Sequence, residues 1–172
     1  MGDQGILTAA HALRIEAMSR DPWLARLRFA AIGWATVELE RAAEELSIAF
    51  SRARLPEPDW SPAPRDALLG AAAWRSDSVS ERWPGVILLE PDTEGRLAAT
   101  LARFDEGVAA IYLEAPAGAA SDPDARVTVD RARVGAVAAG PLGPSWLVLA
   151  RPAWGPHVVV VTAPSPTSVP GG

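Results

Sequence analysis

The stretch Val86–Glu114, VILLEPDTEGRLAATLARFDEGVAAIYLE, decides the fold prediction because it holds two apolar strands joined by a short amphipathic helix. Residues 85–90 (GVILLE) and 107–114 (GVAAIYLE) are apolar runs of strand length. Between them, an acidic turn opens a predicted helix over 92–106, in which two leucines and a phenylalanine share one face. A strand, a helix and a strand in this order form one candidate structural unit.

The same strand-then-helix order occurs nearer the N-terminus. Residues 27–37 (LRFAAIGWATV) form an apolar run, and over 38–50 the apolar spacing changes to that of an amphipathic helix. The tetrad FAAI at 29–32 resembles VAAI at 108–111. This short echo is consistent with a duplicated strand–helix–strand unit.

The remaining segments complete the secondary-structure prediction. The sequence predicts a first helix over 8–20, a proline-rich loop over 55–66, a strand over 67–74, a segment at 126–140 that suits either strand or helix, and a closing hairpin of strands 146–150 and 157–162. The four prolines of 55–66 are the reason for predicting a loop there.

Composition excludes several chemistries. The net charge is −5, all sixteen basic residues are Arg, and the chain has no Lys, Cys or Asn. A Lys Schiff base, a Cys nucleophile and a thiolate metal site are therefore impossible. The charge argues against nucleic acid or a membrane as a partner. With no targeting segment or long apolar run in view, we expect a soluble cytoplasmic protein.

Two segments carry a resemblance to a known family. Residues 30–46, AAIGWATVELERAAEEL, resemble the opening of vicinal oxygen chelate proteins, a group that includes glyoxalase, methylmalonyl-CoA epimerase and bleomycin-resistance proteins. There, a strand similar to H-I-G-I-A-V precedes D-L-E-x-A and a helix. Residues 86–114 look like the epimerase-type stretch E-L-L-E-P, a short helix and G-E-G-x-H-H-I-A-F. The resemblance covers about half of the chain.

The resemblance implies an α+β fold in which paired βαβββ modules form a curved mixed sheet around a cavity, with an extra N-terminal helix. It also implies a homodimer. It divides the chain into an N-terminal helical extension (1–26), a first module (27–91), a linking helix (92–106), a second, degenerate module (107–163) and a disordered tail (164–172).

The family's metal ligands are replaced in this chain. The resemblance places the four ligand positions at Ala31, Ile87, Ala110 and either Val159 or Val160. None of these side chains has a lone pair for a metal ion. We therefore predict no metal and no cofactor, and the metal-dependent activities of the family do not transfer.

Strand alternation then predicts a cavity lined by small and apolar groups, with Trp34 and Glu90 on the other face. Tyr112 is its polar group, and Trp74, Trp146 and Trp154, whose orientation stays open, are possible stacking surfaces. The predicted ligand-binding residues are Phe29, Ala31, Gly33, Trp74, Ile87, Leu89, Ala110, Tyr112 and Trp146; Ala35 and Val108 are also expected to face inward.

Tyr112 and His157 are the candidate catalytic residues if the protein is an enzyme. His157 faces the cavity as a possible general base if Val159 is the replaced ligand, and faces outward if Val160 is. Of the two, we expect the outward, structural role. No phosphate loop, dinucleotide fingerprint or nucleophile elbow is present.

The sequence therefore favours a metal-free protein that binds a small hydrophobic or aromatic molecule in an apolar cavity. Two alternatives remain. One is a metal-independent isomerase, cyclase or lyase that uses the same cavity. The other is a non-catalytic scaffold whose cavity is filled by its own side chains.

Overall fold

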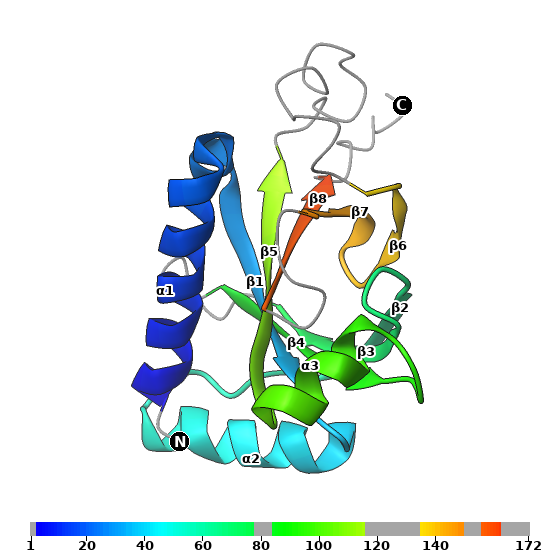
Figure 1. Ribbon diagram of the computed structural model, residues 1–172. Coiled ribbons are helices and arrows are strands. Elements are labelled where there is room, and N and C mark those ends of the chain that lie inside the picture. Colours follow the sequence, from blue (N-terminus) through cyan, green and yellow to red (C-terminus); the bar gives the residue numbers. More distant parts are fainter. Residues whose placement is uncertain (1–2, 78–83, 116–134, 150–155, 163–172) are drawn as a thin grey trace, which may run out of the picture.

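The helices and strands that the sequence predicts occur in the predicted order, and a further strand lies within the predicted proline-rich loop. The computed structural model describes residues 3–77, 84–115, 135–149 and 156–162 (Figure 1). Its elements are α1 (Asp3–Arg20), a 3-10 helix (Pro22–Arg26), β1 (Arg28–Ala35), α2 (Leu39–Arg52), β2 (Ser61–Asp66), β3 (Ala71–Ser76), β4 (Gly85–Pro91), α3 (Arg96–Phe104), β5 (Gly107–Ala115), β6 (Ala138–Gly140), β7 (Gly143–Leu147) and β8 (His157–Thr162).

The strands form one mixed sheet made of two similar halves. Its order is β2-β3-β4-β1-β5-β8-β7-β6. The central pair β1 and β5 is antiparallel, while β4 runs parallel to β1 and β8 parallel to β5. Each half thus places its first and last strands side by side. The predicted α+β fold with paired modules is confirmed, and the module boundaries stay a prediction.

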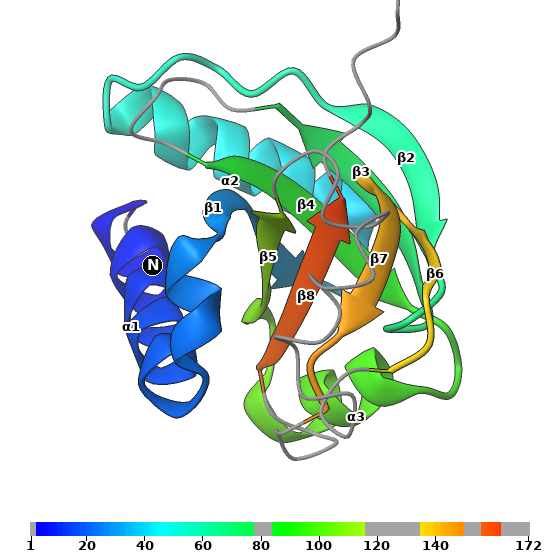
Figure 2. The same ribbon diagram turned by 90° about the horizontal axis from the view of Figure 1, so that it is seen from above.

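The sheet curls until its two edges nearly meet (Figure 2). The backbone N–H of Ala67, just after β2, donates to the carbonyl of Ala139 in β6 at 3.0 Å. Curling gives the sheet an enclosed inner face and an outer face, and the two faces have separate hydrophobic clusters. The inner face is where the resemblance predicts a cavity.

Helices α1 and α2 cover the outer face (Figures 1 and 2). Leu13 of α1 and Leu46 and Phe50 of α2 join one cluster with the outward-facing Ile32 and Ile111. The apolar spacing predicted for 38–50 is therefore the buried stripe of α2. Helix α1 begins earlier than predicted, at Asp3, and packs against β5. Within the described residues no helix is long and apolar enough to cross a membrane.

The proline-rich segment contains a strand, so the loop predicted for 55–66 is wrong in its second half. β2 is an edge strand, in which Pro62 lies opposite Trp74 and Ala63 opposite Ala73 of β3. Proline lacks the N–H that a central strand needs, but an edge strand tolerates the loss.

Three predicted boundaries move. The strand predicted over 67–74 runs over Ala71–Ser76, since residues 67–70 form a turn, and Gly70 adopts a φ of +69° there. The first strand of the closing hairpin is Gly143–Leu147 and not 146–150. Of the ambiguous segment 126–140, residues 138–140 form β6; its part up to 134, like the predicted tail 164–172, lies outside the described residues.

Candidate functional site

One end of the enclosed inner face is filled by the protein's own side chains. We call it the closed end: here β1 and β4 finish, and α3 and the β2–β3 turn lie across the sheet. Leu69 from the turn, Leu97 from α3 and Leu89 from β4 are fully buried. At Gly33 a Cβ would lie 2.8 Å from the Cβ of Ala110, closer than real Cβ contacts. These residues pack closely against one another on the inner face.

A buried hydrogen bond crosses this closed end. The Tyr112 hydroxyl donates to Asp66 Oδ2 at 2.7 Å, and Asp66 Oδ1 accepts the backbone N–H groups of Leu68 and Leu69 at 3.0 and 2.9 Å. Desolvation raises the pKa of Asp66, while these hydrogen bonds oppose the rise. Desolvation and the nearby carboxylate also raise the pKa of Tyr112. The pair ties the β2–β3 turn to the central strand β5.

His157 also lies inward at the closed end. Its partner in the sheet is Ala110, and it shares a face with Val159 of the inner cluster. The ring is 2% exposed, and Nε2 lies 3.1 Å from Thr100 Oγ1 on α3. The expected outward orientation of His157 is therefore wrong, because the register of β8 makes Val159, and not Val160, the inward residue.

The replaced metal positions converge on the inner face. Ala31, Ile87, Ala110 and Val159 all belong to the inner cluster, each at most 1% exposed. The resemblance implies metal ligands at these four positions, but their side chains contain only carbon and hydrogen. These residues therefore do not fit a divalent metal ion. Among the described residues, no three His, Asp or Glu side chains lie close enough together to hold one.

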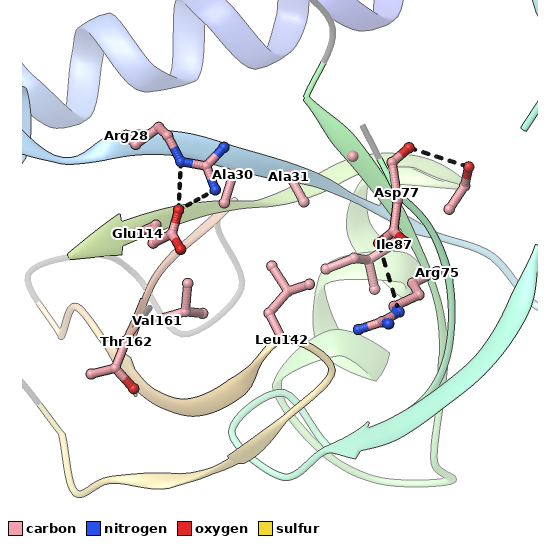
Figure 3. A pocket seen from close by; sticks show the side chains of 12 residues that line it. Arg28, Ala30, Ala31, Arg75, Asp77, Ile87, Glu114, Leu142, Val161 and Thr162 are labelled. Carbon is pink, nitrogen blue, oxygen red and sulfur yellow. Dashed lines mark hydrogen bonds and ion pairs between the residues drawn. The ribbon is translucent and has the colours of Figure 1, made fainter. Parts of the chain in front are cut away.

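The opposite end of the inner face is hollow. We call it the open end: here β1 and β4 begin, and β5 and β8 finish. A pocket of about 240 Å³ opens there (Figure 3). Its apolar lining comes from both halves of the sheet, with Ala31 and Ile87 from the first and Leu142 and Val161 from the second. The remaining lining residues are Arg28, Ala30, Arg75, Ser76, Asp77, Gly85, Glu114 and Thr162.

Two arginines line the pocket, and they differ in how strongly each is paired with an acidic residue. Arg28 pairs with Glu114 through a hydrogen bond and a close ion pair, and Glu114 is largely buried beneath it (Figure 3). Arg75 has a looser partner: its Nε lies 3.8 Å from an oxygen of Asp77, whose side chain is 85% exposed. Water screens such an exposed pair, so Asp77 offsets little of the Arg75 charge.

The predicted ligand-binding residues separate into three groups. Ala31 and Ile87 line the pocket. Gly33, Leu89, Ala110 and Tyr112 face inward as predicted but lie within the filled closed end, together with Ala35. Phe29, Trp74, Trp146 and Val108 pack against the outer cluster, as does Trp34.

The inward placement predicted for Phe29 and Val108 is wrong because two bulges interrupt the β1–β5 pairing. The register shifts between Phe29 and Ala31 and again opposite Ala109, so strict alternation fails at both points. The tryptophans are excluded from the inner face by their strand positions: Trp74 lies between the inward Ala73 and Arg75, and Trp146 lies opposite the outward Val160.

Glu90 points away from the inner face, as alternation predicts. Its Oε2 accepts the backbone N–H of Leu39 at 3.2 Å, at the start of α2. A carboxylate at a helix N-terminus is favourable, because the N–H groups there lack partners within the helix. Glu90 thus has a structural role.

The sequence prediction missed most of the open end, although alternation gave a partial signal. Glu114 continues the inward series of Ala110 and Tyr112. Arg75 continues that of Ala71 and Ala73, but the predicted strand ended one residue earlier, at Trp74. Leu142 lies between β6 and β7, where the sequence carries no strand period.

Several solved structures share this arrangement. A methylmalonyl-CoA epimerase from Mycobacterium tuberculosis matches with a TM-score of 0.60 at 17% identity, over 79% of this chain and 88% of that chain. A Streptomyces coelicolor methylmalonyl-CoA epimerase variant in complex with 2-nitronate-propionyl-CoA matches with 0.57 at 20% identity, over 80% and 97%. A hypothetical protein from Bacillus halodurans matches with 0.57 at 15% identity, over 83% and 98%.

These matches establish the class of fold. The chain has the vicinal oxygen chelate fold, as the sequence resemblance implied. No protein-family model matches the sequence, and no curated protein matches it. At these identities the solved structures show similarity in fold alone. The name methylmalonyl-CoA epimerase applies to those proteins.

Proposed function

We propose that this protein binds a small, mainly apolar molecule in the pocket at the open end of the curled sheet, without a metal ion. The observation that carries the proposal is the pocket of about 240 Å³ on the inner face, where apolar side chains from both halves lie beside polar and charged ones. A concave apolar site with a few polar groups is the usual form of a small-molecule site. Homodimer formation and a cytoplasmic location remain part of the proposal.

Metal independence follows from the chemistry of the four replaced positions. Ala31, Ile87, Ala110 and Val159 offer no lone pair, and burial among apolar side chains disfavours a bare cation. The resemblance implies that the activities of the family depend on a metal ion. Epimerase activity is therefore not proposed for this chain.

A second candidate is the scaffold with a filled cavity. The packing of the closed end around Leu69, Leu97 and Tyr112 favours it. A metal-independent enzyme has less support, since Tyr112 and His157 are buried, bonded to Asp66 and Thr100, and absent from the pocket lining.

Methyl NMR with a library of small neutral aromatic and alicyclic compounds tests the binding proposal. The δ1 methyl of Ile87 and the methyls of Leu142 should shift with saturable concentration dependence, because both residues line the pocket. Ala30→Trp should abolish the shifts by filling the pocket. Ala72→Trp is the matched control, since Ala72 is an exposed residue of β3 outside the pocket lining.

The two candidates predict opposite results. Shifts that saturate, and that Ala30→Trp removes while Ala72→Trp keeps, support a binding protein. If no compound shifts either residue while both variants remain folded, the binding proposal is wrong and the scaffold stands.

A further inference from the structure

We propose that the molecule bound at the open end carries a carboxylate, and that Arg75 holds this group while the apolar body lies against Ala31, Ile87 and Val161. The inference rests on the proposed binding function and specifies its ligand class. It follows from the placement of Arg75 beside the apolar residues of the pocket, with a weaker ionic partner than the pocket's other arginine, Arg28, has.

Arg75 is the last inward residue of a row on β3. Ala71 and Ala73 precede it on the inner face, and both are buried in the inner cluster. In the sheet Arg75 lies opposite Ile87, which is fully buried. The Arg75 side chain therefore lines the pocket next to the apolar Ile87 (Figure 3).

Arg75 is also available for a ligand. Among the described residues, its ionic contact is the one between Nε and the solvent-exposed Asp77, and this leaves the two terminal nitrogens of the guanidinium for another acceptor. The planar guanidinium binds a carboxylate through two parallel hydrogen bonds, a geometry that a neutral ligand group cannot match.

The other charges of the pocket favour an anionic over a cationic ligand. Glu114 is held by Arg28, and its side chain is 17% exposed, so a ligand cation would have to displace an existing ion pair. Asp77 lies largely in water, where pairing is weak. The charge that the pocket leaves for a ligand is therefore the positive charge of Arg75.

The pocket volume limits the size of the apolar body. An apolar cavity of about 150 Å³ accommodates benzene. The pocket of about 240 Å³ thus has room for one ring and a small polar group. Phenylacetate, with one ring, one methylene and one carboxylate, has this size and charge.

The test compares phenylacetate with phenylacetamide, a neutral compound of nearly the same shape, by titration of the Ile87 methyl signal. We expect phenylacetate to bind about tenfold more tightly, as for a hydrogen-bonded charge that is partly screened by water. The preference should shrink as salt concentration rises. Arg75→Gln should remove the preference, whereas Arg52→Gln, on the exposed surface of α2, should keep it.

The outcomes separate this inference from the function on which it rests. A preference for the acid that depends on Arg75 supports both. Equal binding of the acid and the amide, unchanged by Arg75→Gln, overturns the carboxylate inference and leaves a neutral-ligand pocket. Tighter binding of the acid that Arg75→Gln leaves intact assigns the anion to another residue and also overturns it. Absence of binding by both compounds overturns the inference and counts against the pocket itself.

Discussion

The two ends of the inner face share one sheet and differ in what fills them. At the closed end, leucines from α3 and the β2–β3 turn pack around Tyr112, whose hydroxyl is bound to the buried Asp66. At the open end, the same strands leave a pocket, and the polar pairs Arg28–Glu114 and Arg75–Asp77 reach solvent. The polar groups of the closed end are buried and hydrogen-bonded to each other, whereas those of the open end are in contact with solvent.

The closed end is held together by side chains of this chain. In the closed end, a tyrosine, an aspartate and leucines occupy the interior and link strands that are distant in sequence. A buried apolar group or a satisfied buried hydrogen bond stabilises the folded state. Packing therefore links the two halves at the closed end, while the pocket lies at the open end.

The largest expected difference between the ends is in packing. Leu69→Ala should lower the free energy of unfolding by about 2–5 kcal/mol, because it opens a cavity in the fully buried closed end. Leu142→Ala, at the half-buried open end, should cost less than half as much. Urea denaturation of the two variants measures both values. Equal losses would show that the two ends are packed alike.

The next effect concerns the buried hydrogen bond. Tyr112→Phe should lower the free energy of unfolding by about 1–3 kcal/mol, because the ring still packs but the buried Asp66 loses a donor. Urea denaturation at neutral pH is the measurement. A variant as stable as the natural chain would mean that the pair does not stabilise the closed end.

A pH titration of stability sharpens the role of Asp66. Burial raises the pKa of its folded-state carboxyl above the ordinary 3.8, so just above that pH the folded protein keeps a proton that the unfolded chain has released. The contribution of Asp66 to the free energy of unfolding therefore decreases as pH rises through this window. Asp66→Asn should lack this decrease in urea denaturation followed against pH. Parallel curves for the two proteins would contradict the raised pKa.

The smallest expected effect is at the open end. Glu114→Gln should change the free energy of unfolding by less than about 1 kcal/mol, because the Arg28 side chain that pairs with Glu114 is 66% exposed. Thermal and urea denaturation are sufficient to measure it. A loss as large as that for Tyr112→Phe would mean that the open end is built for stability as well.

Prediction from sequence worked best where one period runs without interruption. The apolar stripe of α2 and the strands β4 and β5 lie close to their predicted positions. Burial of one face imposes a regular spacing of apolar residues, and this spacing is visible in the order of the residues. It failed at Phe29 and at the prolines of β2. A bulge and an edge position both depend on a neighbouring strand that is distant in sequence.

The candidate site was predicted in part for the same reason. Alternation correctly placed Ala31 and Ile87 on the inner face, where they line the pocket. It could not separate them from Gly33 and Leu89, which share that face but lie in the filled end. Whether a position on the inner face is covered depends on which loops and helices pack over it, and the local sequence does not reveal this.

The likeness to vicinal oxygen chelate proteins, the α+β fold that it implies and the apolar side chains at the replaced positions were all evident from the sequence. These features follow from local periodicity and from residue identity, which need no neighbours. Only the folded structure shows at which end of the inner face the pocket lies, which way His157 points, and that Arg75 rather than Tyr112 lines the pocket. These depend on strand register and on the packing of α3 and the β2–β3 turn, contacts between segments far apart in the chain.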